Sequence, residues 1–514
     1  MNLVIYGPPG SGKTTVGRLA AARLGREFVD GDDWIEARWG RAVADYFAAG
    51  EEALFRQREA EAYRALAARA DQVLAPGGGA LLDPHLRATL EQSGTVVCLS
   101  ASVATLAGRL ENDVASRPLL AGDLRARLAE LLRARDGLYH SFAHQINTDN
   151  CPVERVADEA IAVFQAASRF TRFELGRTSA LFGHGLLTEL PRLLAAKAMR
   201  PPFIVIADSA VAALHGDAVQ KALGAALLAF PSGETNKNLD TVRALYADCV
   251  RLGLERDGNL VAVGGGVAGD MIGFVAATYM RGVSWANLPT TVLAMADASL
   301  GGKVGVDLPE GKNLVGAFHP PALVAADFDF LSTLPAVEVR CGLAEILKAG
   351  IIGDAELFEG LPAGAVPLER AIVRAAAVKV GVVNADPFEH GERATLNLGH
   401  TIGHGVEAAS GYRLRHGESV AIGMLAETRL AERIGLAEAG LAERVSAGLA
   451  RLGLPTGCSG LDPAGIRAAM NSDKKRAGGR LKFALPRCPG EVVWGREVDE
   501  AELMAALEGI TRAA

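Results

Sequence analysis

Short apolar runs alternate with longer amphipathic stretches along the first part of the chain, to about residue 165. The runs LVIYG, QVLAPGGGA and GTVVCLS are typical of buried strands, whereas EEALFRQREAEAYRALAARA has helical spacing. This alternation predicts a parallel sheet covered by helices. The segment FQAASRFTRFELGRTSALFGHG interrupts it, so we expect a domain junction near residues 165–175.

A second set of apolar runs follows the junction and extends to about residue 330: FIVIADSAV, GNLVAVGGG and ALVAADFDFL. From PAVEVRCGLAEILKAGI onward helical periodicity dominates, with strand-like passages at RLKFALP and GEVVWG. The stretch LVAVGGGVAGDMIGFVAATYM resembles a membrane span, but its glycines and Asp270 favour a buried strand, loop and helix. The pattern predicts an α/β protein with domains at residues 1–168 and 173–330 and a mainly helical domain at 331–514.

Size and composition narrow the function classes. The 514 residues exceed what one hydrophobic core usually organises, and 49% of them are hydrophobic, so we expect a chain folded throughout. The net charge of −7 is mild and basic residues are scattered, which favours small-molecule partners over nucleic acid or an anionic membrane.

Six widely spaced cysteines without a CxxC pair indicate free thiols in a reducing compartment. MNLVIYGPPGSGKTT enters an apolar run at once and leaves no room for a signal peptide, so we expect a cytoplasmic enzyme.

The segment GPPGSGKT matches G-x-x-x-x-G-K-[ST] between a predicted strand and a predicted helix. Its glycines allow backbone N–H groups to face phosphate oxygens, Lys13 can reach the outer phosphates, and the Thr14 hydroxyl can hold magnesium. In FVDGDDWIE, Asp30 and Asp32 end a predicted strand; one carboxylate can support magnesium and the other can accept a hydroxyl proton. Each acidic residue alone is more often a turn or helix cap.

The motifs GEEALFRQRE, PGGGA, RPLL and RARDGLY follow in an order that resembles shikimate kinase over the whole first domain. The resemblance implies transfer of the ATP γ-phosphoryl group to a hydroxyl of shikimate. A gluconate kinase is the nearest alternative because of DGDD, but RPLL and the FR pair favour shikimate. The resemblance implies a nucleotide site of Gly10, Ser11, Gly12, Lys13, Thr14, Thr15 and Arg117, the last on a lid. It also implies a shikimate site of Asp32, Arg56, Gly78 and Arg135, magnesium at Thr14 and Asp30, and catalysis by Lys13 and Asp32.

The stretch RATLNLGHTIGHGVEA reads as one helix with an unusual polar stripe. Arg393, Asn397, His400 and His404 are spaced i, i+4, i+7 and i+11, which would place them along one side. Solvated helix faces usually carry Glu and Lys, so this mixture of a cation, an amide and two imidazoles favours a site over a simple surface stripe.

A catalytic zinc site needs about three N and O ligands from the protein and an open position for substrate. Glu345, His400 and His416 would meet that requirement, and Lys348 shares a helix face with Glu345. Two histidines spaced i, i+4 are weak evidence alone.

Earlier in the same half of the chain, GGGVAGD follows the run NLVAV with G-x-G-x-x-G spacing and would open a helix facing a pyrophosphate. The acidic residue expected about twenty positions later is missing, so the dinucleotide fold is not the ordinary one.

The glycine-rich segment SLGGKVGVDLPEGKNLVG adds Lys303, Lys312 and Asn313, which suit an anionic ligand. From about residue 173 to the end, the chain resembles 3-dehydroquinate synthase. The motifs that carry this resemblance are SGETNK, GGGVAGDMIGFVAATYMRG, LPTTVLAMADASLGGKVGVD, KNLVGAFHPP, GLAEILKAGII, LNLGHTIGHGVE, HGESVAIGM and SDKKRAGG. It implies zinc or cobalt and NAD in one site that converts 3-deoxy-arabino-heptulosonate 7-phosphate to 3-dehydroquinate and phosphate without net redox.

The resemblance also implies site residues and a partner. The metal ligands are Glu345, His400 and His416, and the catalytic side chains are Lys303, Lys348 and His404. The substrate contacts are Arg281, Asp297, Lys303, Asn313, Lys348, Lys379, Arg393, Asn397, His404 and Lys474, with Arg281 supplied by a neighbouring subunit of a homodimer. The NAD contacts are Asp208, Glu234, Lys237, Gly266, Val267, Ala268, Gly269, Asp270, Thr290, Thr291, Lys303, Lys312, Phe330 and Thr333. Ala210 replaces an Asn often found in the family, which affects the expected ribose contact near Asp208.

We therefore expect a bifunctional enzyme of aromatic amino acid biosynthesis, with ATP and magnesium at one site and NAD and zinc at the other. One alternative makes the second half another sugar phosphate cyclase or a zinc alcohol dehydrogenase. A different alternative makes the first half a nucleotide-sensing module that regulates the second.

Overall fold

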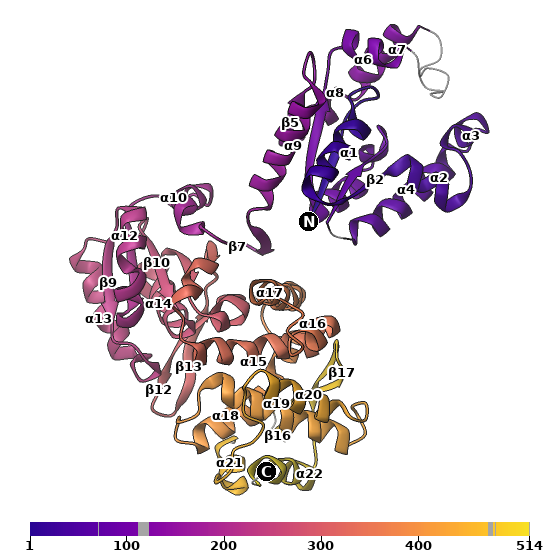
Figure 1. Ribbon diagram of the computed structural model, residues 1–514. Helices are drawn as coiled ribbons and strands as arrows, with labels where there is room; N and C mark the ends of the chain where they lie inside the picture. The colour runs from indigo at the N-terminus through magenta and orange to yellow at the C-terminus, as the bar shows by residue number, and fades with distance from the viewer. Residues whose placement is uncertain (70, 112–122, 471–475, 478–479, 513–514) are drawn as a thin grey trace. The chain divides into compact units, whose positions relative to one another are not determined.

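The structure is a computed structural model that describes residues 1–69, 71–111, 123–470, 476–477 and 480–512 (Figure 1). The chain divides into two compact units, Met1–Arg169 and Phe170–Ala514. All six cysteines are free, as the sequence predicts. Throughout the described ranges, each helix is too short or too polar to cross a bilayer.

The N-terminal unit is built on five parallel strands in the order β2-β3-β1-β4-β5. The strands are β1 Asn2–Tyr6, β2 Glu27–Asp30, β3 Gln72–Ala75, β4 Gly94–Ser100 and β5 His144–Asn147. The helices are α1 Lys13–Leu24, α2 Gly31–Trp39, α3 Val43–Ala48, α4 Glu52–Ala67, α5 Pro84–Ser93, α6 Val103–Leu110, α7 Leu124–Ala134, α8 Asp136–His140 and α9 Val153–Ser168, with the 3-10 turn η1 Ala80–Leu82.

The central strand β1 shows why this sheet is covered on both faces. Leu3 and Ile5 pack into a core with α1 and α9, whereas Val4 and Tyr6 pack into a second core with α4 and α5. Successive side chains of a strand point to opposite faces, so a continuous apolar run requires helices on both sides. The predicted parallel α/β domain is confirmed.

The C-terminal unit begins with a seven-stranded sheet in the order β6-β7-β14-β11-β10-β8-β9, in which β6 is antiparallel to β7 and the other described pairs are parallel. The strands are β6 Thr171–Leu175, β7 Thr178–Gly183, β8 Phe203–Asp208, β9 Ala226–Phe230, β10 Asn259–Gly264, β11 Ser284–Pro289 and β14 Leu323–Asp327. Between them lie α10 Leu186–Ala196, α11 Ser209–Val211, η4 Ala212–Gly216, α12 Asp217–Leu223, η5 Glu234–Asn236, α13 Leu239–Arg251, α14 Gly266–Thr278, η6 Tyr279–Arg281, η7 Ala294–Ala298 and η8 Phe328–Thr333.

A hairpin of β12 Lys303–Leu308 and β13 Gly311–Phe318 extends from this sheet, and helices follow it. They are α15 Ala336–Gly353, α16 Ala355–Gly360, α17 Leu368–Ala385, η9 Glu392–Asn397, α18 His400–Ala409, α19 His416–Arg433, α20 Leu441–Arg451, α21 Pro463–Ala469 and α22 Glu500–Thr511. The predicted short strands are confirmed as the hairpin β17 Phe483–Cys488 and β18 Glu491–Arg496, beside the two-residue strands β15 Arg476–Ala477 and β16 Arg480–Leu481.

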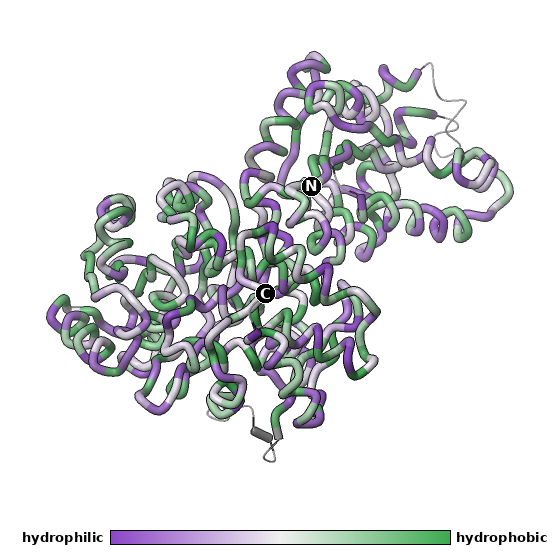
Figure 2. Tube along the Cα trace, turned by 60° about the horizontal axis from the view of Figure 1, so that its bottom comes forward, coloured by the Kyte–Doolittle hydropathy of each residue, from purple (hydrophilic) through white to green (hydrophobic). Residues whose placement is uncertain are grey.

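The sheet and the helices of this unit share one hydrophobic core. Val261 of β10, Leu347 of α15 and Met424 of α19 belong to the same buried cluster. Along many helices the hydropathy alternates within a turn or two, as expected for helices with one face in a core (Figure 2). Helices α15 and α19 therefore pack in the same core as the sheet, and α18 packs against α19 through Ile402 and Val406.

The single helix predicted across residues 393–408 is wrong. The structure has the 3-10 segment η9, then extended Leu398 and Gly399 with φ of 79°, and α18 begins only at His400. A Cβ on Gly399 would lie 2.9 Å from the carbonyl oxygen of Val420, so this tight contact with α19 requires glycine. The buried Glu427 carboxylate accepts hydrogen bonds from the backbone N–H groups of Gly399 and Ile402 and satisfies the start of α18.

Candidate active sites

The loop between β1 and α1 carries the predicted phosphate site. Gly7, Gly10 and Gly12 have φ of 148°, 78° and 92°, a backbone region that favours glycine. The hydroxyl of buried Ser11 has no hydrogen-bond partner among the residues that the structure describes. A curled backbone and an unsatisfied buried hydroxyl fit an anionic phosphate group.

The residues predicted to hold the outer phosphates and magnesium begin helix α1. The Lys13 ammonium donates to the carbonyl oxygens of Gly7 at 2.9 Å and Pro8 at 3.2 Å, so it lies over the loop. The Thr14 hydroxyl donates to the Asp30 carboxylate at 2.8 Å. The two predicted magnesium ligands are therefore in contact, with exposed Thr15 beside them on α1.

The predicted acceptor residues of the N-terminal unit meet around the loop of Gly77, Gly78 and Gly79. Arg135 donates to the Gly78 carbonyl oxygen at 2.7 Å. A Cβ on Gly77 would lie 2.8 Å from the Asp32 carboxylate, and one on Gly79 would lie 2.8 Å from the Arg56 guanidinium. Two guanidinium groups and one carboxylate thus surround this loop and leave little space for side chains at Gly77 and Gly79, an arrangement suited to a small hydroxy acid.

Glu59 is a residue of this group that the sequence did not predict. It lies on α4, is 2% exposed, and accepts a hydrogen bond from Arg56 at 2.7 Å. Burial raises the pKa of Glu59 to about 7, although the neighbouring Arg56 guanidinium opposes this shift. The i, i+3 spacing after Arg56 in FRQRE could have suggested the pair, but nothing in the sequence shows its burial.

The raised pKa of Glu59 predicts a pH-dependent stability of the N-terminal unit. Because the folded-state pKa lies above the ordinary glutamate pKa of 4.5, the protonated group stabilises the fold at low pH, and this contribution is lost as pH rises toward about 7. The full effect is up to about 3 kcal/mol. We expect amide hydrogen exchange of α4 to quicken from pH 4.5 to 7, after correction for intrinsic exchange, more in the wild type than in Glu59→Gln. Equal pH dependence in both proteins would contradict the prediction.

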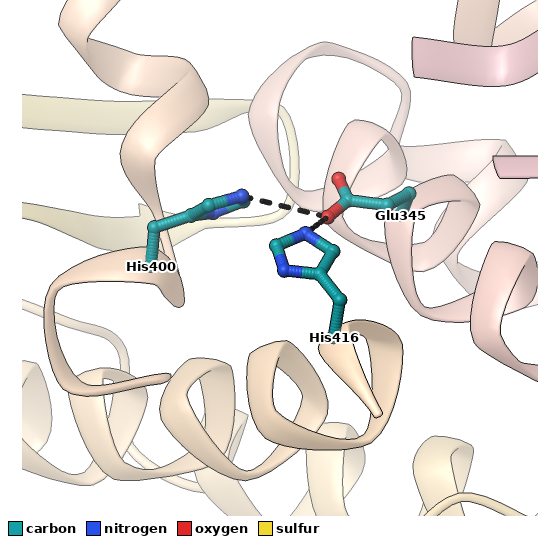
Figure 3. A group of neighbouring side chains, drawn as sticks. All are labelled: Glu345, His400 and His416. Carbon is teal, nitrogen blue, oxygen red and sulfur yellow. Dashed lines mark ion pairs between the residues drawn. The ribbon is translucent and has the colours of Figure 1, made fainter. Parts of the chain in front are cut away.

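The three predicted metal ligands converge from three helices of the C-terminal unit. The Glu345 Oε1 atom of α15 lies 3.6 Å from His400 Nε2 of α18 and 3.5 Å from His416 Nε2 of α19. Their potential ligand atoms all lie within 4.8 Å of one another, and Figure 3 shows the side chains pointing toward one another. The buried Glu345 oxygens accept no well-aligned hydrogen bond from the described residues, although Oε2 forms an ion pair with Lys348. One buried carboxylate and two imidazoles fit a zinc or cobalt ion.

Neighbouring charges favour the carboxylate form of Glu345 and the protonated form of His416. Burial opposes ionisation of Glu345, but Lys348 and His416 outweigh that effect and hold its pKa below the usual value. Burial likewise opposes the charge of His416, but the Glu345 and Glu407 carboxylates raise its pKa.

The predicted substrate residues form a charged group beside the metal ligands. Asp297 of η7 lies 2.8 Å from the Lys379 ammonium and 4.0 Å from the Lys348 ammonium. These two cations hold the pKa of Asp297 below its usual value despite burial. The His404 ring lies 5.3 Å from the His400 ring, and the buried Arg393 donates to the Gly301 carbonyl oxygen at 3.0 Å. Although Arg393 and Asn397 precede α18, the fold still brings them to this site.

Glu389 is a second carboxylate that the sequence interpretation missed. It forms an ion pair with Lys303 and accepts a hydrogen bond from Asn397 at 3.2 Å. Both partners are predicted substrate contacts. Glu389 has a positive φ of 61°, in the segment between α17 and η9, and the irregular loop gave no periodic pattern that could identify it.

The predicted dinucleotide residues lie where parallel strands end, at one edge of the sheet. Asp208 ends β8, and Gly264 ends β10 and accepts a hydrogen bond from the backbone N–H of Thr290 after β11. The first turns of α14 carry Gly266, Val267, Ala268, Gly269 and Asp270, Thr291 follows Thr290, and η8 after β14 carries Phe330 and Thr333. The carboxyl edge of a parallel sheet is where such folds bind nucleotides.

Charged side chains connect this edge with the β12–β13 hairpin. The Lys237 ammonium lies 2.6 Å from the Asp270 carboxylate and donates to Asn313 at 2.7 Å. Lys312 pairs with Glu234 at 3.3 Å. Asp208 caps α11 by accepting from the Ala210 and Val211 backbone N–H groups, so one of its oxygens is already engaged.

The structure does not describe two of the predicted contacts, and it places a third, Arg281, on the surface. Arg117 and Lys474 lie outside the described residues. Arg281 is exposed at the end of η6.

Models of known families match most of the chain. Residues 9–165 match shikimate kinase, residues 227–341 the N-terminal part of 3-dehydroquinate synthase, and residues 342–476 its C-terminal part. A 3-dehydroquinate synthase from Symbiobacterium thermophilum is 44% identical over 327 residues, which is 60% of this chain and 90% of that protein. The chain belongs to the 3-dehydroquinate synthase family.

Solved structures agree with this membership. The 2-epi-5-epi-valiolone synthase of Streptomyces hygroscopicus subsp. jinggangensis 5008, with NAD+ and Zn2+ bound, is 31% identical with a TM-score of 0.60, covering 64% of this chain and 96% of that one. A 2-deoxy-scyllo-inosose synthase with carbaglucose-6-phosphate, NAD+ and Co2+ is 27% identical with a TM-score of 0.61, covering 66% and 99%. Identity to the 3-dehydroquinate synthase is higher than to either cyclase. The chain is a shikimate kinase domain fused to a 3-dehydroquinate synthase, a bifunctional enzyme of the shikimate pathway.

Proposed function

We propose that the two groups of side chains described above are the two active sites of this fusion enzyme. The observation that carries the proposal for the synthase is the convergence of Glu345, His400 and His416 within 4.8 Å, beside the Asp297–Lys379 pair. For the kinase it is the meeting of Asp32, Arg56 and Arg135 at the Gly77–Gly79 loop.

In the kinase domain, ATP bound together with magnesium would supply the phosphoryl group. The loop N–H groups and Ser11 bind the phosphates, and Lys13 turns from the loop carbonyls toward the outer phosphates. Thr14 and Asp30 hold the magnesium ion. Arg56 and Arg135 clamp the shikimate carboxylate, and Asp32 accepts the proton of the attacking hydroxyl.

In the synthase, Glu345, His400 and His416 would hold zinc or cobalt, which would supply polarisation of a substrate oxygen. The residues at the carboxyl ends of the strands would hold NAD, which would supply a reversible hydride acceptor. Lys303, Lys348 and Lys379 provide positive charge for an anionic substrate, and His404 lies close enough to the ligand rings to move a proton. The buried Arg393 positions the segment that carries Asn397.

We also propose a domain organisation and an assembly for this enzyme. Its domains span residues 1–168, 173–330 and 331–514. The synthase forms a homodimer, in which Arg281 reaches the substrate of the neighbouring subunit. Exposure of the Arg281 side chain at the end of η6 supports that reach. Six free cysteines support a cytoplasmic location.

Substrate dependence tests the proposed function. We expect ATP consumption only when shikimate is added, with gluconate as the negative control. We expect phosphate release from 3-deoxy-arabino-heptulosonate 7-phosphate without accumulation of NADH. ATP binding without shikimate-dependent turnover would favour a nucleotide-sensing module, and net NADH formation would favour a dehydrogenase.

A further inference from the structure

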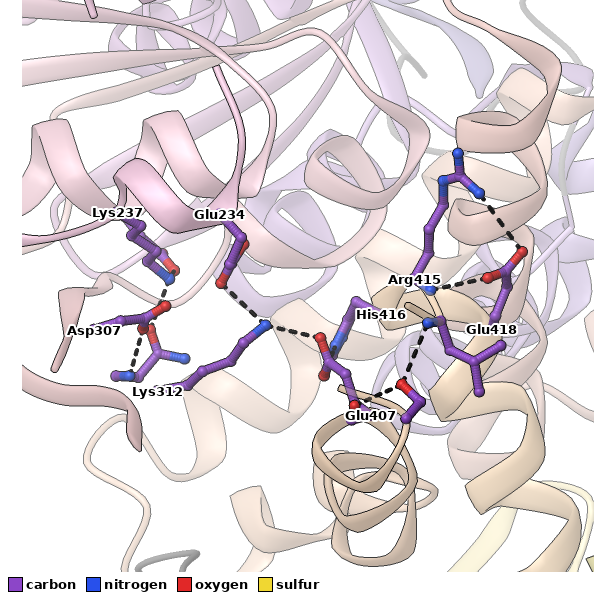
Figure 4. A network of polar contacts seen from close by, with 12 residues as sticks. Glu234, Lys237, Asp307, Lys312, Glu407, Arg415, His416 and Glu418 are labelled. Carbon is purple, nitrogen blue, oxygen red and sulfur yellow. Dashed lines mark hydrogen bonds and ion pairs between the residues drawn. The ribbon is translucent and has the colours of Figure 1, made fainter. Parts of the chain in front are cut away.

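Glu407 lies between the metal ligands and the dinucleotide edge of the synthase. It is on α18, one turn after His404, and is 5% exposed. Its Oε2 atom faces His416 Nδ1 at 3.8 Å, and its Oε1 atom accepts a hydrogen bond from Lys312 at 2.7 Å. Figure 4 shows Glu407 between Lys312 and the His416 ring.

The two nitrogens of the His416 ring therefore face two different carboxylates. Nε2 lies 3.5 Å from Glu345, on the side of the three metal ligands, whereas Nδ1 faces Glu407. A neutral imidazole can offer a lone pair from only one nitrogen while the other carries hydrogen. The partner of the second nitrogen decides which tautomer forms and fixes the ring orientation.

A purely structural role for Glu407 is the competing explanation. A buried carboxylate needs a partner, and Lys312 supplies one, so the pair could simply fasten the β12–β13 hairpin to α18. However, the Lys312 ammonium also lies 3.3 Å from the Glu234 carboxylate, so the charge of Lys312 is balanced even without Glu407. The approach of Glu407 Oε2 to His416 is the feature that a simple fastening role does not explain.

We propose that Glu407 is a positioning residue of the synthase metal site. It accepts the Nδ1 hydrogen of His416, which leaves the Nε2 lone pair directed toward Glu345 and His400. The 3.8 Å separation exceeds a hydrogen bond, so the proposal requires Glu407 Oε2 and His416 Nδ1 to come closer when the site is loaded. The inference rests on the proposed function, since it assumes that His416 is a ligand.

A second metal ion, bound by Glu407 itself, is the other possible explanation for this arrangement. His404, Glu407 and His416 also have potential ligand atoms within 4.8 Å of one another. The Lys312 ammonium, 2.7 Å from Glu407, already supplies positive charge at that position and would repel a further cation. The geometry therefore supports one metal ion per chain, with Glu407 behind its ligand.

Zinc affinity of the metal-free full-length enzyme tests the proposal. We expect Glu407→Gln to weaken Zn²⁺ binding by about 10–100-fold in competition with a chromophoric chelator. The visible spectrum of the Co²⁺-loaded variant should also differ from that of the wild type. Lys312→Met breaks the same ion pair but leaves the acceptor for His416, so any loss of zinc affinity should be clearly smaller than that of Glu407→Gln.

Glu418→Gln is the control for the start of α19. Glu418 accepts from the Arg415 backbone N–H at 2.9 Å and lies two residues after His416. Glutamine can still accept this bond, so the variant removes a carboxylate charge near the His416 ring and leaves the Nδ1 partner in place. Unchanged zinc affinity in Glu407→Gln, or equal loss in Lys312→Met or Glu418→Gln, would overturn the positioning role. Two zinc ions per wild-type chain would favour the second-cation alternative and overturn it as well.

Nitrogen-15 NMR of histidine in the zinc-loaded wild type gives a result that does not depend on any variant. We expect His416 with hydrogen on Nδ1 and metal on Nε2; the reverse arrangement contradicts the inference. If the wild-type enzyme binds no zinc at all, the proposed metal site itself fails. If the wild type binds zinc and Glu407→Gln binds it equally well, only the role of Glu407 fails and the metal site stands.

Discussion

Replacing His400 with alanine is expected to lower phosphate release from 3-deoxy-arabino-heptulosonate 7-phosphate by at least about a thousandfold, or about 4 kcal/mol. His400 Nε2 lies 3.6 Å from Glu345, whose buried oxygens accept no well-aligned hydrogen bond from the described residues, so the variant leaves a metal ion with two protein ligands. Zinc content should fall together with activity.

Two controls accompany the His400 variant. The shikimate-dependent reaction should be unchanged, because Met1–Arg169 is a compact unit with its own hydrophobic cores. His184→Ala removes an imidazole that is 58% exposed in the same unit as His400 and should retain normal phosphate release. Near-normal phosphate release by His400→Ala would remove His400 from the metal site.

Replacing Lys13 with methionine is expected to lower the shikimate-dependent consumption of ATP by about a thousandfold while leaving phosphate release by the synthase unchanged. Lys13 is the only lysine among residues 1–169, so no other lysine of this unit can take its place. Methionine keeps most of the length of the side chain but removes the charge that faces the outer phosphates.

Arg23→Met is the matched control for Lys13→Met, because it removes a cation from the other end of α1, where Arg23 pairs with Asp158. The measurements are steady-state kinetics with ATP and with shikimate varied separately. A loss confined to the shikimate KM would contradict the assignment of Lys13 to the phosphates. Losses of similar size in both variants would indicate damage to α1 rather than to the site.

Contiguous segments were predictable from the sequence because their geometry is local. The phosphate loop needs glycine at positions with positive φ, and the periodicity of apolar residues assigns β1 and α4 without knowledge of their neighbours. The metal ligands were also identified, although Glu345 and His416 lie on different helices, because their residue types and the family resemblance both pointed to zinc.

The missed residues are carboxylates whose importance comes from burial and from partners distant in the sequence. Glu389 contacts Lys303 of the β12–β13 hairpin, and Glu407 contacts Lys312 of the same hairpin. Glu59 is adjacent to Arg56 in α4, yet its raised pKa arises first from burial. Acidic residues with ordinary helical spacing look like solvated positions until the fold covers them.

Local sequence was enough to predict the alternation of strands and helices, the phosphate loop and the chemical types gathered for a metal site, since these depend on neighbouring residues and side-chain chemistry. The break between η9 and α18 at Gly399 could be seen only in the folded chain, because the close approach of α19 and the Glu427 carboxylate impose it. It also decided which carboxylates face His416, because packing of α15, α18 and α19 sets those distances and local propensity does not.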